Sequence, residues 1–179
     1  LPTSDISGLR VLVVDDNTTS RQIFREQLKS FGCRALQAED PAHIEEILIH
    51  QAQQGYPVAV ALLAISLPGS ASADLARRIK GDPTVAGTAL ILVTTIPGRA
   101  EAVRLQQAGF SAYLVKPVRH TTLRETIAAV VGQVQPAHGS KPLVTAESLM
   151  AQKAPSRLRV LLADDNQVNL RVAGRILEK

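Results

Sequence analysis

Short, mostly apolar runs alternate along the chain with longer stretches in which apolar residues recur every three or four positions. The runs lie at residues 11–14, 33–38, 58–65, 89–93 and 112–115. Runs of this length are typical of strands buried on both faces of a parallel sheet. The stretches between them have the period of helices that cover such a sheet. The pattern therefore predicts an α/β domain of five strand–helix units that ends near residue 132.

The first predicted helix has well-marked ends. Asn17 or Thr18 is suited to cap its N-terminus, and Gly32 is suited to close its C-terminus. We expect the inward face of this helix to comprise Ile23, Phe24, Leu28 and Phe31. Asp40 followed by Pro41 predicts the start of the second helix.

A nine-residue sequence occurs twice in similar form. LRVLVVDDN at residues 9–17 returns as LRVLLADDN at residues 158–166, followed again by a helical pattern. Such a repeat indicates two domains of the same kind. We therefore expect a complete domain over residues 8–132 and a polar, proline-containing linker over 133–157. Residues 158–179 would be the first strand and helix of a second, truncated domain, so the chain is expected to be a piece of a longer protein.

Composition argues against several functional classes. Of the 179 residues, 45% are hydrophobic and 20% are charged, so the chain can bury a core. No apolar run approaches the roughly 20 residues that span a bilayer, and we expect no membrane contact by this fragment. The net charge of +4 forms no basic stripe and aromatic residues make up 3%, which argues against nucleic-acid binding. A single cysteine, Cys33, favours a cytoplasmic location, although the parent chain could be membrane-anchored.

Polar side chains follow several of the predicted strands, where open α/β sheets carry their sites. Asp15 and Asp16 follow the first run, Thr94 follows the fourth and Lys116 follows the fifth. We expect these side chains to lie at one edge of the sheet. Alternatively, the two acids would only stabilise the following helix, whose dipole has its positive end there, and would mark no functional site.

With these features the chain resembles the receiver domains of two-component response regulators, and more closely the tandem receivers attached to hybrid sensor histidine kinases. The matching stretches are VLVVDDN at 11–17, LPG at 67–69, LVT at 92–94 and GFSAYLVKPV at 109–118. The resemblance spans about residues 8–132 and implies a flavodoxin-like, doubly wound (βα)5 sheet. It also implies the family's reaction, the transfer of a phosphoryl group from a phosphohistidine to an aspartate.

The resemblance implies roles for five residues. Asp15 and Asp16 match the acid pair that helps to hold Mg²⁺. Thr94 matches the hydroxyl that binds one phosphoryl oxygen, and Lys116 matches the ammonium group that pairs with another. Tyr113 matches the aromatic residue whose rotamer reports phosphorylation.

The phosphoacceptor position departs from the family pattern. Counting back four residues from Pro68 gives Ala64, whose methyl group cannot attack phosphorus. We therefore expect a degenerate, non-phosphorylatable receiver with no catalytic residue. With one carboxylate fewer, Mg²⁺ should bind weakly or not at all, and Lys116 should form an ion pair with Asp16 or Asp15 instead.

The alternative is a receiver that still accepts a phosphoryl group at an unconventional residue: Asp15, Asp16 or Ser66. In the leading interpretation this fragment is not an enzyme but a regulatory module of a histidine kinase. Its expected partners are the kinase core and the second receiver of the same parent protein, or another copy of itself. In that second receiver, Asp164 and Asp165 would form the acid pair.

Overall fold

The computed structural model describes residues 5–64, 71–95, 99–132 and 144, and within them five strands and five helices alternate. The strands are β1 (Arg10–Val14), β2 (Arg34–Ala38), β3 (Val60–Leu63), β4 (Ala89–Thr94) and β5 (Ala112–Val115). The helices are α1 (Thr18–Ser30), α2 (Ile44–Gln53), α3 (Ala71–Gly81), α4 (Arg99–Ala108) and α5 (His120–Gly132), with a 3-10 turn at Pro41–His43 before α2.

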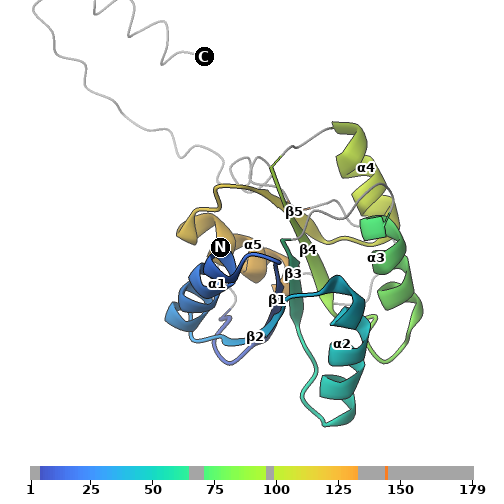
Figure 1. Ribbon diagram of the computed structural model, residues 1–179, viewed down its shortest axis with the longest axis horizontal. Coiled ribbons are helices and arrows are strands. Elements are labelled where there is room, and N and C mark those ends of the chain that lie inside the picture. Colours follow the sequence, from blue (N-terminus) through green and yellow to red (C-terminus); the bar gives the residue numbers. More distant parts are fainter. Residues whose placement is uncertain (1–4, 65–70, 96–98, 133–143, 145–179) are drawn as a thin grey trace, which may run out of the picture.

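The strands form one parallel sheet in the order β2-β1-β3-β4-β5. Helices cover both of its faces (Figure 1), so the predicted flavodoxin-like (βα)5 fold is confirmed. Because all the strands are parallel, their carboxyl ends meet at the same edge of the sheet. No helix in the described part of the chain is long and apolar enough to cross a membrane.

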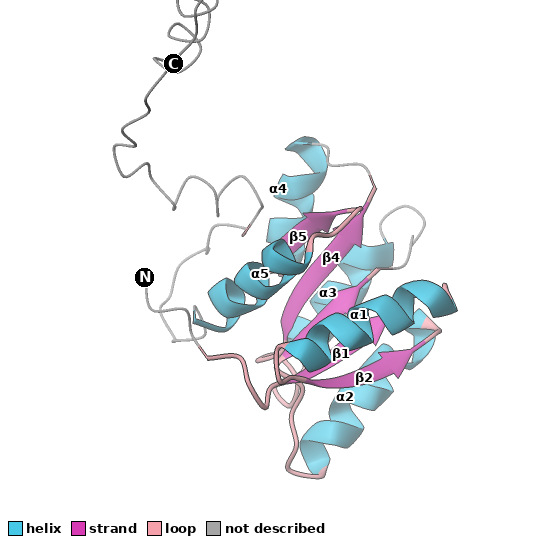
Figure 2. Ribbon diagram, turned by 90° about the vertical axis from the view of Figure 1, so that its left-hand side faces the viewer, coloured by secondary structure: helices cyan, strands magenta, loops and turns pink. Residues whose placement is uncertain are grey.

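The sheet separates two apolar clusters, because successive side chains of a strand point to opposite faces. In β1, Val11 and Val13 belong to the cluster beneath α1 and α5, whereas Leu12 and Val14 belong to the cluster beneath α2, α3 and α4. Figure 2 shows these two groups of helices on opposite faces of the sheet. These four side chains are fully buried, and burial of each contributes roughly 1.5–3 kcal/mol to stability.

Helix α1 has the predicted ends but not the whole predicted inward face. The Asn17 side chain caps it by accepting the Ser20 N–H at 2.9 Å, and Gly32 follows its last turn with a φ of +78°. Ile23, however, is 53% exposed, so its predicted inward position is wrong. Each residue turns a helix by about 100°, so Ile23 points well away from the buried Phe24 beside it.

Candidate functional site

Four neighbouring strands bring the predicted site residues to one edge of the sheet. Asp15 follows β1, Ala64 follows β3, Thr94 ends β4 and Lys116 follows β5. The backbone ladder continues to these ends, since the Ala64 N–H donates to the Val14 carbonyl at 2.7 Å and the Lys116 N–H donates to the Thr94 carbonyl at 2.8 Å. These hydrogen bonds fix the backbone from which the site side chains extend.

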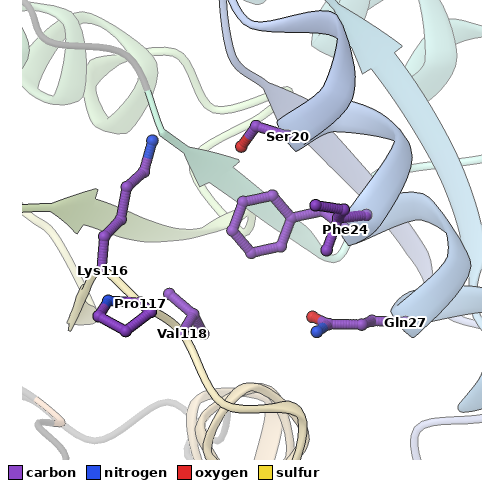
Figure 3. Close-up of a pocket in the computed structure, with 7 residues that line it drawn as sticks. Ser20, Phe24, Gln27, Lys116, Pro117 and Val118 are labelled. Atoms are coloured by element: carbon purple, nitrogen blue, oxygen red, sulfur yellow. The ribbon is translucent and has the colours of Figure 1, made fainter.

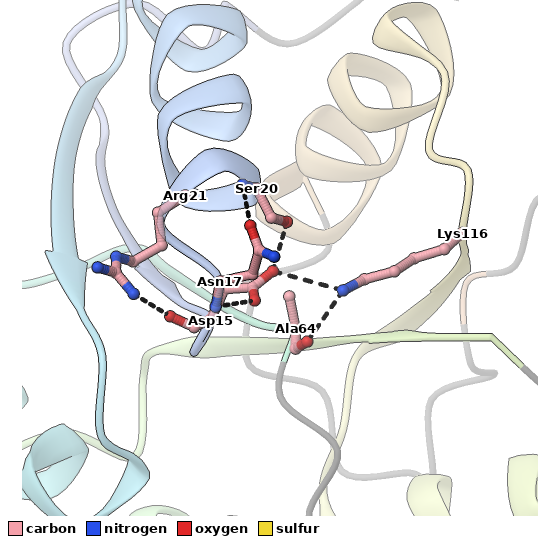
Figure 4. Close-up of polar contacts among 6 residues, drawn as sticks. All are labelled: Asp15, Asn17, Ser20, Arg21, Ala64 and Lys116. Atoms are coloured by element: carbon pink, nitrogen blue, oxygen red, sulfur yellow. Dashed lines mark hydrogen bonds and ion pairs between the residues drawn. The ribbon is translucent and has the colours of Figure 1, made fainter.

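The Asp15 carboxylate is buried at the centre of this edge, with 1% of its side chain exposed. Its Oδ1 accepts the Asn17 N–H at 2.9 Å, and its Oδ2 accepts the Ser20 hydroxyl at 2.5 Å (Figure 4). Burial raises the pKa of Asp15, but the Ser20 and Asn17 hydrogen bonds and the Lys116 charge outweigh it and leave the pKa below its ordinary value. Asp15 is therefore a buried carboxylate that is held in its ionised form.

The Lys116 side chain extends across the edge and contacts two neighbouring strand ends. Its Nζ lies 3.4 Å from Asp15 Oδ2 and donates a hydrogen bond to the Ala64 carbonyl oxygen at 3.1 Å (Figure 4). Of the two acids expected to pair with Lys116, the structure therefore brings Asp15 to it. Ala64 is 4% exposed, and its side chain offers only a methyl group at the end of β3.

Asp16, Thr94 and Tyr113 are the other predicted site residues that the structure describes. Asp16 is exposed, and within the described residues no hydrogen bond or ion pair joins it to Lys116. Thr94 is half-buried at the end of β4, and Tyr113 is half-buried against the apolar cluster on the α4 side of the sheet. Ser66, together with Asp164 and Asp165 of the repeat, lies outside the described residues.

Two residues that sequence reasoning missed hold the loop between β1 and α1. Ser20 donates to the Asp15 carboxylate, while the buried Arg21 guanidinium donates to the Asp15 backbone carbonyl at 2.6 Å. Arg21 also contacts Thr18 Oγ1 at 3.1 Å and Glu39 Oε2 at 3.3 Å. The spacing of Ser20 three residues after the Asn17 cap was a usable signal, since this position faces the start of the helix.

An open, mainly apolar groove of about 490 Å³ adjoins the site (Figure 3). It runs between α1 and the segment that joins β5 to α5, and it is lined by Ser20, Ile23, Phe24, Gln27, Lys116, Pro117 and Val118. The exposed Ile23 side chain is thus one of the residues that line this groove. The groove places apolar surface directly beside the charged site.

The described residues do not fit a resident Mg²⁺ ion. Proteins usually hold Mg²⁺ through one or two carboxylates together with phosphate oxygens and water. The Asp15 carboxylate already accepts two hydrogen bonds and contacts Lys116, whose ammonium group also binds the Ala64 carbonyl. Nowhere in residues 5–64, 71–95 and 99–132 do three His, Cys, Asp or Glu side chains cluster as metal ligands. A lysine ammonium group provides the positive charge at this edge.

One family model and several known proteins match the same region of this chain, which includes most of the described residues. The response regulator receiver domain family matches residues 11–128. The chemotaxis protein CheY1 of Helicobacter pylori is 30% identical over 125 residues, covering 69% of this chain and 98% of that protein. A chemotaxis protein CheY homolog of Campylobacter jejuni is 28% identical over 125 residues, covering 69% of this chain and 93% of that protein.

Solved structures share the same fold at lower identity. A response regulator from Thermotoga maritima has a TM-score of 0.62 and 18% identity, covering 70% of this chain and 99% of its own. The receiver domain of a sensor histidine kinase from Pseudomonas aeruginosa, solved with a magnesium ion in its active-site cleft, has a TM-score of 0.60 and 21% identity. That match covers 71% of this chain and 100% of the other.

Proposed function

Because the chain belongs to the response regulator receiver domain family of two-component systems, we propose that it is a member that accepts no phosphoryl group and acts by binding other signalling proteins. Receiver domains are signalling modules that interact with kinases or other signalling proteins. The observation that carries the proposal is Ala64, which stands at the end of β3 beside Lys116 and Asp15.

The chemistry of transfer supports this proposal. A phosphoacceptor must supply an oxygen that forms a new bond to phosphorus while the bond from phosphorus to the donor nitrogen breaks. The Ala64 side chain has no such oxygen. The contacts of Lys116 to Asp15 and to the Ala64 carbonyl also engage the ammonium group that would otherwise meet an incoming phosphoryl oxygen.

The charges at the site support a receiver that is stable without bound Mg²⁺. A buried carboxylate is costly unless it is paired and hydrogen-bonded. Asp15 is both, through Lys116, Ser20 and the Asn17 N–H, so this arrangement needs no divalent cation to be stable. Weak or absent Mg²⁺ binding is therefore part of the proposal.

The proposed setting is a hybrid sensor histidine kinase in the cytoplasm. The sequence repeat supports a second receiver that begins at residue 158, after a linker over 133–157, with Asp164 and Asp165 as its acid pair. Receivers of this fold do occur in a sensor histidine kinase, as in the Pseudomonas aeruginosa protein. In this setting the domain over 8–132 would bind the kinase core, the second receiver or another copy of itself.

The test is incubation of the chain with acetyl phosphate and Mg²⁺, followed by intact-mass measurement. We expect no gain of a phosphoryl group. A stable gain would overturn the proposal, and the variants Asp15→Asn, Asp16→Asn and Ser66→Ala would then identify the unconventional acceptor. A receiver with an intact acceptor aspartate, run in parallel, shows that the donor is active.

A further inference from the structure

The outer edge of the sheet carries a contact that the proposed function does not explain. β5 is the last strand in the sheet order, so one of its sides has no neighbouring strand. On that side the Val144 N–H donates to the Ser111 carbonyl at 2.9 Å, and the Tyr113 N–H donates to the Val144 carbonyl at 3.2 Å. Val144 thus pairs in parallel with Ala112, as a residue of an added strand would.

The Val144 side chain is also part of the core. It is 3% exposed and belongs to the apolar cluster that includes Ala112, Leu123 and Ile127, between the sheet and α5. Val144 lies twelve residues beyond the end of α5 at Gly132. Two backbone hydrogen bonds and a buried β-branched side chain are the features by which extended segments are recognised at sheet edges: the backbone supplies affinity and the side-chain pocket supplies selectivity.

We propose that the outer edge of β5 is a binding site for an extended apolar segment, and that its resident occupant is Val144 of the same chain. Occupation covers the backbone of Ser111 and Tyr113 at the sheet edge, which would otherwise be open to strand addition by another protein. This inference does not depend on whether the domain is phosphorylated.

Amide hydrogen exchange of the full chain, followed by NMR, tests this site. We expect the Tyr113 and Val144 amides to be protected in the wild type. In Val144→Asp, which places a charge in the apolar site, Tyr113 should exchange at least about tenfold faster. Val103→Asp is the matched control, because Val103 lies on α4 and is 53% exposed, and it should leave Tyr113 exchange unchanged. The amide of Leu62 in the central strand β3 should exchange equally in all three proteins, which separates local release from global unfolding.

Three results would overturn the proposal: an unprotected Tyr113 amide in the wild type, unchanged Tyr113 exchange in Val144→Asp, or an equal acceleration in Val103→Asp. If Val144→Asp also accelerates Leu62, the milder Val144→Ala replaces it, with the same expectation for Tyr113. Protection should not vary with protein concentration. Protection that rises with concentration would place Val144 on another copy and contradict the intramolecular site.

Discussion

Replacement of Lys116 by methionine should destabilise the domain by about 1–2 kcal/mol. Methionine keeps the length and apolar stem of the side chain but removes the charge that lies 3.4 Å from Asp15 Oδ2 and the donor that lies 3.1 Å from the Ala64 carbonyl. At 3.4 Å two unit charges attract by about 1 kcal/mol in water and several-fold more at a protein surface. Because 34% of the Lys116 side chain is exposed, solvent screens the ion pair and its attraction is near the value in water. Loss of the hydrogen bond to the Ala64 carbonyl adds about 1 kcal/mol to the destabilisation.

A double-mutant cycle separates the ion pair from the other effects of the substitution. Wild type, Lys116→Met, Asp15→Asn and the double variant are unfolded in urea at neutral pH, and the free energy of unfolding of each is compared. We expect a coupling energy of about 1 kcal/mol between the two positions. Lys29→Met, at an exposed position on α1, is the matched control and should change stability by less than about 0.5 kcal/mol. A coupling energy near zero would refute the view that Lys116 compensates the Asp15 charge.

Three further outcomes follow from the described contacts. Ser20→Ala should lower the free energy of unfolding by about 1–2 kcal/mol and raise the pKa of Asp15, which NMR titration of its carboxyl carbon would detect; an unchanged pKa would contradict the hydrogen bond. The Asp15 pKa lies below its ordinary 3.8, so its ionised form stabilises the fold at neutral pH and this contribution is lost as the pH falls below 3.8 through the folded-state pKa. The stability difference between wild type and Asp15→Asn should therefore stay constant from about pH 7 to about pH 5 and shrink as the pH falls below about 4, and a difference that stays constant at low pH would argue against it. Gly109→Ala should cost more than about 1 kcal/mol, because φ there is +101° and the added Cβ would lie 2.7 Å from Lys80 Cγ, whereas Gly87→Ala, with open space around it, should cost less.

The fold was predictable because its core strands are buried on both sides. β3 has apolar side chains at every position and β1 has them at all but its first, Arg10, which marks central strands of a parallel sheet without any alignment. The N-cap at Asn17 and the turn at Gly32 were equally local signals. The face of α1 was harder, because Ile23 and Phe24 are both apolar and neighbouring, and tertiary packing decides which of them is buried.

The site was predictable in its residue types but not in its contacts. The strand ends identified Asp15 and Lys116, yet 101 positions separate them in the sequence, and no local pattern reports which of two adjacent acids meets the lysine. The supporting roles of Ser20 and Arg21 arise from the path of the loop after β1. The return of Val144 to the β5 edge is a long-range pairing, and a valine within a polar stretch gives little sign of it.

In the proposed function, the absence of a carboxylate at Ala64 prevents phosphoryl transfer to this domain. The most direct measurement compares the wild type with Ala64→Asp by intact mass after incubation with acetyl phosphate and Mg²⁺. We predict that the wild type stays unmodified and that the variant gains one phosphoryl group, since the aspartate restores both a nucleophile and a metal ligand beside Asp15. A wild-type chain that stably gains a phosphoryl group would contradict this proposal.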